Sequence, residues 1–349
     1  MEKDILKKFD LQLFAHDASD RNVQVTTNAS GQKDMSPTMK VFYDTALLEN
    51  ARENLIFDQF GDKQPIHGNK VEWRKFNTFG TALTPLTEGV IPDGKDFGMA
   101  KIEASTTQHG QYTTISDRLE LESYDDVIYG ATEEMGAAGA ETMDILTRNV
   151  ISAGTSVAYC PKVTDAGAVT ETTQRNQITD ECKLTPEMVA KAATWLKKNK
   201  APKIRGSYVA LIHPSVAFDL RNSDEWKEYH KYNDTAPIFN GEIGELHGVR
   251  FVESNNCMVT EDGASNSSGG NSNYAVYATL FLGMKSYGVI EPNGESMEMI
   301  IKSREQIGGP LNQYSTIGFK FCHGAKILYP ERILRVESGS SYSTVDRAN

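Results

Sequence analysis

Residues 70–116 read KVEWRKFNTFGTALTPLTEGVIPDGKDFGMAKIEASTTQHGQYTTIS, and this stretch decides the architecture. Apolar and charged side chains alternate over 70–76, which indicates a half-buried strand. A second strand-like run, rich in threonine, spans about 99–116. The intervening residues 77–98 hold four glycines and two prolines. Because structureless loops of about 20 residues are unusual in compact domains, residues 66–116 predict a long two-stranded arm.

An isolated hairpin is marginally stable in water, so such an arm must lie on another molecule. The predicted anchors near its base are Trp73, Arg74, Phe76 and Phe79, since aromatic and Arg side chains typically dominate protein contacts. The alternative interpretation of this region is a disordered surface loop.

Composition excludes several classes of protein. The 349 residues are 39% hydrophobic and carry a formal net charge of -11, which argues against a disordered chain and a generic nucleic-acid binder. No apolar run reaches the 18 residues of a transmembrane helix. Four cysteines in this length exclude a disulfide-stapled scaffold and favour a reducing compartment. We also expect no export signal in residues 1–15.

The N-terminal part, residues 1–65, is expected to be an arm followed by a first helix. Residues 1–15 fit a short amphipathic helix that either frays or docks on a partner. Residues 16–37 are polar and cannot offset their own ordering entropy. From Ser36-Pro37, apolar spacing predicts a helix to about residue 54.

A long helix is predicted over 123–152, within a segment bounded at 117–154, and a capping box formed by Ser123 and Asp126 is expected to start it. Gly136 and Gly139 lie inside this helix, where they either allow close packing or mark a bend. Residues 117–150 hold nine acidic and two basic residues, so this helix is strongly acidic.

Residues 155–310 indicate a mixed α/β region. Thr185-Pro186 predicts a helix start, and the run YVALI at 208–212 predicts a buried strand. Further strands are predicted within 243–252 and 274–282, and, beyond them, at 297–301, 317–321 and 327–336. The polar, glycine-rich residues 261–273 predict a surface loop.

One segment of this acidic chain is basic. Residues 183–205 carry seven cations and one acid, among them Lys197, Lys198, Lys200, Lys203 and Arg205. Three interpretations remain open: a solvated helix face, a contact with an acidic neighbouring subunit, and nucleic-acid binding. The third ranks last because aromatic residues are nearly absent from the segment.

No catalytic motif emerges, so we expect no enzyme, no cofactor and no metal. Strand alternation would place Cys322 and His323 on opposite faces, which argues against a metal site there. We interpret His213 before Pro214 as a helix-entry residue rather than a base. The sequence thus combines projections that cannot stabilise themselves with no active site, which is typical of a self-assembling structural protein.

The order of these segments resembles the major capsid proteins of tailed bacteriophages, and within them the group similar to a podovirus major coat protein. The resemblance covers about residues 40–336. The stretches that carry it are Phe42 to Gly61, Gly68 to Gly89, Ser116 to Leu146 and Gly241 to Glu253, with the opening residues 8–15.

The resemblance implies an α+β tailed-phage capsid fold. It divides the chain into the N-terminal arm with the first helix (1–65), an extended β-hairpin loop (66–116), the spine helix of a peripheral domain (117–154), an axial domain (155–310), and return strands of the peripheral domain with the C-terminal tail (311–349).

The implied function is a shell of hexamers and pentamers that encloses double-stranded DNA without binding it specifically. Scaffolding and portal proteins are implied partners, and a decoration protein is a further one; no membrane is involved. The implied location is the virion, after assembly in the host cytoplasm. An encapsulin-type nanocompartment shell is the alternative, and an enzyme with an unrecognised site is a third hypothesis.

Overall fold

The computed structural model describes residues 56–349 apart from short gaps. These gaps are residues 67–69, 77–78, 80, 82, 84, 87, 92–93, 124–126, 165–167, 233–240, 267–271, 293–296, 308–310 and 345. The arm and the helix predicted for residues 1–54 therefore lie outside the described residues. Within the described part of the chain, no helix is long and apolar enough to cross a membrane.

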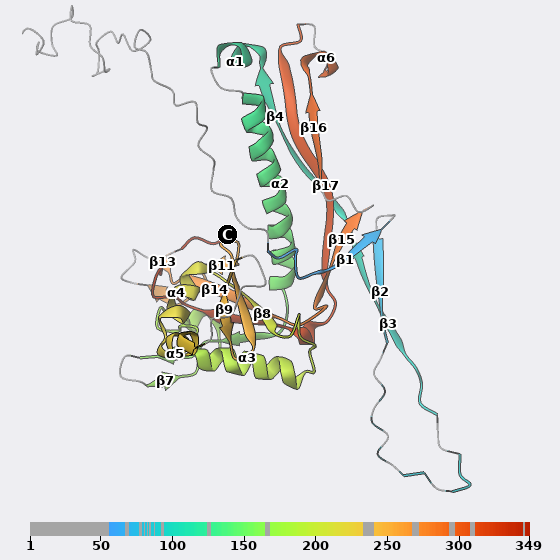
Figure 1. The fold of residues 1–349 in the computed structure, drawn as a ribbon, viewed down its shortest axis with the longest axis vertical. Coiled ribbons are helices and arrows are strands. Elements are labelled where there is room, and N and C mark those ends of the chain that lie inside the picture. Colours follow the sequence, from blue (N-terminus) through green and yellow to red (C-terminus); the bar gives the residue numbers. More distant parts are fainter. Residues whose placement is uncertain are drawn as a thin grey trace, which may run out of the picture. The chain divides into compact units, whose positions relative to one another are not determined.

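The predicted arm is a β-hairpin. Strands β2 (Lys70–Phe76) and β3 (Met99–Ser105) pair antiparallel along their whole length, from Lys70 opposite Ser105 to Phe76 opposite Met99. Figure 1 shows both strands running away from the sheets at whose edge they begin. The arm is shorter than predicted, because the run 99–116 breaks at Thr106 and its second half joins another sheet.

That sheet is built around β17 (Tyr314–Ile327). Strands β4 (Thr107–Ser116) and β16 (Glu298–Lys302) flank the first part of β17, and β15 (Tyr287–Pro292) pairs with its last residues. Strand β1 (Asp62–Ile66) adds to β15 in parallel. The short helix α6 (Arg304–Ile307) follows β16.

The predicted spine is helix α2 (Val127–Ser152), and it packs against β17. A separate helix, α1 (Asp117–Glu122), precedes it, capped by the Ser116 hydroxyl. Ser123 ends α1, because its N–H donates to the Leu119 carbonyl. Asp126, the second residue of the predicted capping box, lies outside the described residues, and the structure shows Ser123 only as the C-cap of α1.

The two spine glycines have different surroundings. A Cβ built on Gly139 would overlap the Met297 sulfur and come within 3.1 Å of the Phe319 ring, whereas one built on Gly136 meets nothing within 4 Å. Close packing therefore explains Gly139 and not Gly136.

A second sheet has the strand order β5-β18-β14-β8-β10-β9, with β11 paired to β14. Its members are β5 (Val157–Tyr159), β8 (Tyr208–Ile212), β9 (Glu242–Leu246), β10 (Val249–Glu253), β11 (Val259–Thr260), β14 (Val276–Leu282) and β18 (Ile333–Ser338). The predicted strand YVALI is β8, and all five of its residues are buried. We call this sheet and the elements around it the α/β lobe. Short two-stranded ribbons and short 3-10 helices belong to the same part of the chain: β6 (Lys162–Val163), β7 (Val169–Thr170), β12 (Ser265–Asn266), β13 (Ser272–Asn273), η3 (Arg175–Gln177) and η4 (Pro330–Arg332).

Helices α3 (Pro186–Lys198), α4 (Pro214–Asn222) and α5 (Asp224–Tyr232) accompany this sheet. The Thr185 hydroxyl accepts from the Met188 N–H and Pro186 opens the helix, as predicted. His213 caps α4 through its ring, which confirms its role as a helix-entry residue. Burial lowers the pKa of His213.

The strands do not follow the division at residue 310. Strands β15 and β16 precede it yet pair with β17, while β18 follows it yet lies between β5 and β14. The boundary predicted between 155–310 and 311–349 therefore cuts through both sheets. One sheet joins β15 and β16 to β17, and the other joins β5 and β14 to β18.

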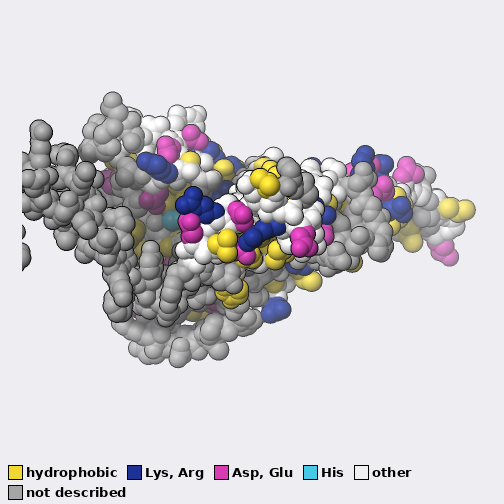
Figure 2. Space-filling view, turned by 90° about the horizontal axis from the view of Figure 1, so that it is seen from above, with side chains coloured by type: hydrophobic (Ala, Val, Ile, Leu, Met, Phe, Trp, Pro, Cys, Tyr) yellow, Lys and Arg dark blue, Asp and Glu magenta, His cyan; other side chains and the backbone are white. Residues whose placement is uncertain are grey.

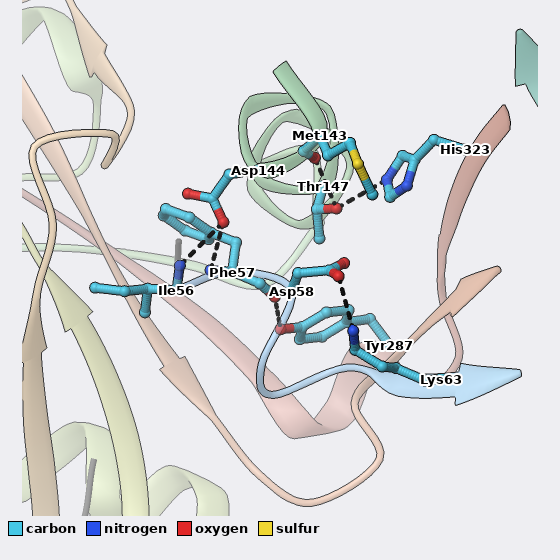
Figure 3. A network of polar contacts seen from close by, with 9 residues as sticks. All are labelled: Ile56, Phe57, Asp58, Lys63, Met143, Asp144, Thr147, Tyr287 and His323. Atoms are coloured by element: carbon cyan, nitrogen blue, oxygen red, sulfur yellow. Dashed lines mark hydrogen bonds and ion pairs between the residues drawn. The ribbon is translucent and has the colours of Figure 1, made fainter. Parts of the chain in front are cut away.

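One turn of α2 joins several distant segments (Figure 3). The Asp144 carboxylate accepts from the backbone N–H groups of Ile56 (3.1 Å) and Phe57 (2.8 Å), and both of these residues are fully buried. The Tyr287 hydroxyl donates to the Phe57 carbonyl, and Thr147 bonds the His323 ring at 2.9 Å.

The same turn also reaches the loop before β11. Arg148 is 2% exposed and donates to the Asn256 carbonyl and to Asn349, whereas the Asn256 amide lies 3.4 Å from Asp144. Burial raises the pKa of Asp144 to about 6, against the opposing effect of its hydrogen bonds.

We predict opposite outcomes for the same substitution at the two spine glycines. Gly136→Ala should stabilise the subunit by up to about 1 kcal/mol, because alanine favours helix and the site is open. Gly139→Ala should destabilise it by about 1–3 kcal/mol through overpacking against β17. Urea unfolding of both variants measures the difference, and a stabilising Gly139→Ala would contradict the packing of α2 on Phe319.

Asp144 predicts a pH dependence. Its pKa is raised from the ordinary 3.8 to about 6, so the stability it contributes is full below pH 4 and is lost as the pH rises through 6, by about 3 kcal/mol. Asp144→Asn keeps an acceptor and removes the charge, so relative to wild type this variant should gain stability between pH 4.5 and 8. Asp144→Ala should lose about 2–4 kcal/mol at pH 7, because two buried N–H groups lose their acceptor. Urea unfolding across this pH range would refute the assignment if the difference between wild type and Asp144→Asn stayed constant.

Candidate assembly surfaces

The base of the hairpin is held inside the subunit. Val71, Ala104 and Ile290 form a small buried cluster, and Trp73 packs against it. A Cβ on Gly288 would lie 2.7 Å from the Trp73 ring, so glycine is required beneath the indole. Trp73 was predicted to be buried only by assembly. The structure corrects this, because the hairpin joins β15 through the Trp73 side chain.

The stem of the hairpin is ionic and exposed. Arg74 pairs with Glu72 at 3.2 Å, and Lys101 pairs with Glu103 at 2.8 Å. The hydrogen bond between them raises the pKa of Lys101 and lowers that of Glu103. Exposed pairs of this kind add little stability, so they keep the stem soluble rather than rigid.

Beyond the stem lies an aromatic stack. Phe97 stacks on Phe76 with ring centroids 4.9 Å apart and on Phe79 at 5.2 Å. All three rings remain more than half exposed. The predicted contacts Phe76 and Phe79 are thus brought together by a third ring from the returning chain, and they lack cover within the described residues.

We define the hairpin tip as the exposed apolar side chains of this region. They are Phe76, Phe79, Leu83, Leu86, Val90, Ile91, Phe97 and Met99, each at least half exposed. In Figure 2 the apolar side chains at the right-hand end mark the projecting hairpin. A set of this size is unusual on a monomer and indicates an interaction surface.

Sequence reasoning had missed six of these residues, of which Met99 was assigned to the second strand. Leu83, Leu86, Val90, Ile91 and Phe97 were assigned to a flexible tip on account of its glycines and prolines. Large apolar residues spaced through a glycine-rich segment were the available signal, because a solvated loop has no need of them.

The predicted basic residues also come together. Lys197 and Lys198 occupy the last turn of α3, where cations favour the helix C-terminus, and Lys200, Lys203 and Arg205 follow in the next loop. All five side chains are exposed. All five are therefore accessible to another molecule.

The structure places no catalytic constellation among the described residues, and no group of three or more His, Cys, Asp or Glu there is arranged to hold a metal. His323 is buried against α2 while Cys322 is half-buried, in agreement with the predicted alternation. Burial raises the pKa of the Cys160 thiol, so this cysteine is unreactive.

Phage capsids of known structure have a similar overall fold. The capsid of cyanophage P-SCSP1u aligns with a TM-score of 0.63 at 15% identity, over 88% of this chain and 95% of the phage chain. The capsid of Ralstonia phage GP4 aligns with a TM-score of 0.63 at 14% identity, over 92% of this chain and 100% of the phage chain. The acid-stable capsid of Helicobacter pylori bacteriophage KHP30 aligns with a TM-score of 0.64 at 10% identity, over 89% of this chain and 99% of the phage chain.

The fold is therefore that of tailed-phage capsid subunits. Residues 116–289, about half of the chain, match the phage capsid protein family. The chain belongs to this family: it is a structural major capsid protein of an icosahedral phage head, and its location is the virion capsid. Family and fold are structural rather than enzymatic. No curated protein sequence matches the chain.

Trp73 and Phe76 should respond differently to truncation. Trp73→Ala should destabilise the unassembled subunit by about 2–3 kcal/mol, because it opens a cavity over Gly288. Phe76→Ala should cost less than about 1 kcal/mol, because the ring is exposed. Urea unfolding followed by far-UV circular dichroism measures both values, and equal losses would contradict the division between hairpin base and tip.

Proposed function

We propose that each subunit lays its hairpin tip on a neighbouring copy, within hexamers and pentamers that close the shell around double-stranded DNA. The observation that carries this proposal is the apolar hairpin tip, whose rings are organised but uncovered within the described chain. A hairpin alone is marginal in water, and a partner surface supplies the missing burial.

The inner surface is proposed to be acidic. Glu134 and Glu141 are exposed, and their spacing of seven residues places them on one face of α2. Facing the lumen, this stripe would repel packaged DNA, which must leave the shell again. Enclosure without specific binding follows from like charge.

We infer further protein partners from the steps that assembly of a shell requires. Closure with the correct curvature and with one opening for DNA calls for scaffolding and portal proteins, and a decoration protein fits the outer surface. Assembly would take place in the host cytoplasm. An encapsulin-type shell is not favoured, because the matched family and the similar structures reported above are phage capsids.

Deletion of residues 80–97 behind a short glycine linker tests the arm. It removes most of the hairpin tip and leaves β2, β3 and the Trp73 joint in place. The subunit should keep its circular dichroism spectrum and lose shells in electron micrographs, because aromatic anchors of such contacts contribute on the order of 2 kcal/mol or more each.

A finer variant separates chain length from side-chain chemistry. Replacement of Phe76, Phe79 and Phe97 by serine should abolish shells, and the matched replacement by leucine should retain part of the yield, because it keeps apolar area. Shells of normal yield from the deletion or from the serine variant would overturn the proposed role of the hairpin.

A further inference from the structure

The tertiary structure extends the basic segment with cations from other parts of the chain. The loop after α3 meets the β14–β15 turn, where the Met284 N–H donates to the Pro202 carbonyl at 2.9 Å. The β14–β15 turn also contacts η4, because the Arg332 guanidinium donates to the Met284 carbonyl at 3.0 Å. Lys285 and Arg332 thus lie beside the predicted basic loop.

The series continues to strand β2 of the hairpin. The Arg332 guanidinium lies 3.8 Å from the centre of the Tyr329 ring, and Lys75 Nζ lies 4.3 Å from the same centre. We call the combined surface the basic ridge. It consists of Lys197, Lys198, Lys200, Lys203, Arg205, Lys285, Arg332 and Lys75.

Little negative charge offsets the ridge within the subunit. Lys75 pairs with Glu331 at 2.8 Å. Among the described residues, no carboxylate lies within ion-pair distance of Lys197, Lys198, Lys200, Lys203 or Lys285. Folding therefore brings like charges together on the ridge. This arrangement gives no stability to the isolated subunit.

Three ridge cations also occupy unfavourable backbone positions. Lys200, Arg205 and Lys285 have φ values of 54°, 49° and 55°, in the left-handed region. Lys200 follows the cap of α3, where the Ala201 N–H reaches back to the Leu196 carbonyl, and this position favours glycine. Arg205 precedes Gly206 in a tight turn whose first position favours asparagine or glycine. Local backbone preference therefore does not explain the three cations, and the charges themselves require an explanation.

The partner that best fits this surface is another copy of the chain. The subunit has a net charge of -11 although residues 183–205 contribute +6, so the surface that a second copy offers is predominantly acidic. Contact of ridge with ridge is excluded by like charge. The contact must therefore be head-to-tail, which is the kind of interface that closes rings.

Helix α5 offers the matching surface. Its carboxylates Asp224, Glu225 and Glu228 are all exposed, and none has an ion pair within the described chain. Trp226 lies between them in sequence, is buried, and meets Phe251 edge-on at 5.7 Å, so it fixes the helix on the lobe. Lys227 also lies on α5, but its ammonium donates to the Asn222 carbonyl at 2.7 Å and to the Asn222 side-chain oxygen at 2.9 Å. Asp224, Glu225 and Glu228 therefore form a preorganised acidic surface on an anchored helix.

We propose that the basic ridge of one subunit docks on the acidic face of α5 in the next subunit, and that this contact orders the copies within a capsomer. The inference rests on the proposed function, since it names the surfaces through which neighbouring copies meet in addition to the hairpin tip.

The first test is the triple variant Lys200→Gly, Arg205→Asn and Lys285→Gly. Glycine and asparagine suit the left-handed backbone, so the subunit should unfold at the same or a higher temperature. Shell yield at physiological salt should fall at least tenfold. The matched control Lys162→Gln, Lys183→Gln and Lys191→Gln makes the same change in net charge on the same lobe and should assemble normally. Normal shells from the ridge variant, or equal losses in the control, would overturn the proposal.

The second test is a charge swap. The ridge variant Lys200→Glu, Lys203→Glu, Lys285→Glu and the α5 variant Asp224→Lys, Glu225→Lys, Glu228→Lys should each fail to form shells, because like charges then face each other. All six substitutions in one chain should restore shells. Absence of rescue would overturn the assignment of α5.

A nucleic-acid role gives a different result. If wild-type subunits bind duplex DNA with strong salt dependence, and the Gly/Asn variant loses this binding while forming normal shells, the ridge is a DNA surface and the proposal is wrong. If the wild-type chain stays a monomer at every salt and protein concentration, the proposed function fails; this outcome differs from failure of the ridge alone, in which wild type and the ridge variant form shells in equal yield.

Discussion

The subunit depends on one buried turn of the spine helix. Asp144 accepts from the backbone of residues 56 and 57, Thr147 bonds His323 of β17, and Arg148 reaches Asn256 and Asn349. Four segments far apart in sequence therefore converge on five consecutive residues. The turn places a carboxylate and a guanidinium where water is absent, and such groups are tolerated only when hydrogen bonds satisfy them. The cost of leaving any of them unpaired fixes where each segment lies along the spine.

The hairpin combines a fixed base with an uncovered end. Trp73 lies over Gly288 and packs, partly buried, against the small cluster at the hairpin base, whereas the stacked rings of Phe76, Phe79 and Phe97 are open to solvent. A rigid base presents the apolar tip at a defined place, which lowers the ordering cost when a neighbour covers it. The exposed ion pairs of the stem keep the same element soluble before assembly.

In the proposed assembly, electrostatics complement the apolar contact of the hairpin tip. The chain is acidic overall, and eight of its 36 Lys and Arg residues form the ridge, which is built from the α3 loop, the β14–β15 turn, η4 and strand β2. Apolar burial supplies affinity without direction, while opposite charges exclude the wrong registers and like-charge pairings. A subunit that uses both gains a strong contact at the hairpin tip and an orientation from the ridge.

The sequence by itself determined the local elements. Alternation over 70–76 predicted β2, the run YVALI predicted β8, and Thr185-Pro186 predicted the start of α3, because period, capping and β-branching act over a few residues. The order of these elements also sufficed to indicate the capsid class. Only the tertiary structure decided that β4 pairs with β17 some 200 residues later. It also decided that Trp73 packs against its own subunit and that Phe97 completes the aromatic stack. Lys285 and Arg332 join the basic loop for the same reason. The reason is that periodicity records which side chains face a core, whereas the partner across that core is chosen by packing and pairing between segments that are distant along the chain.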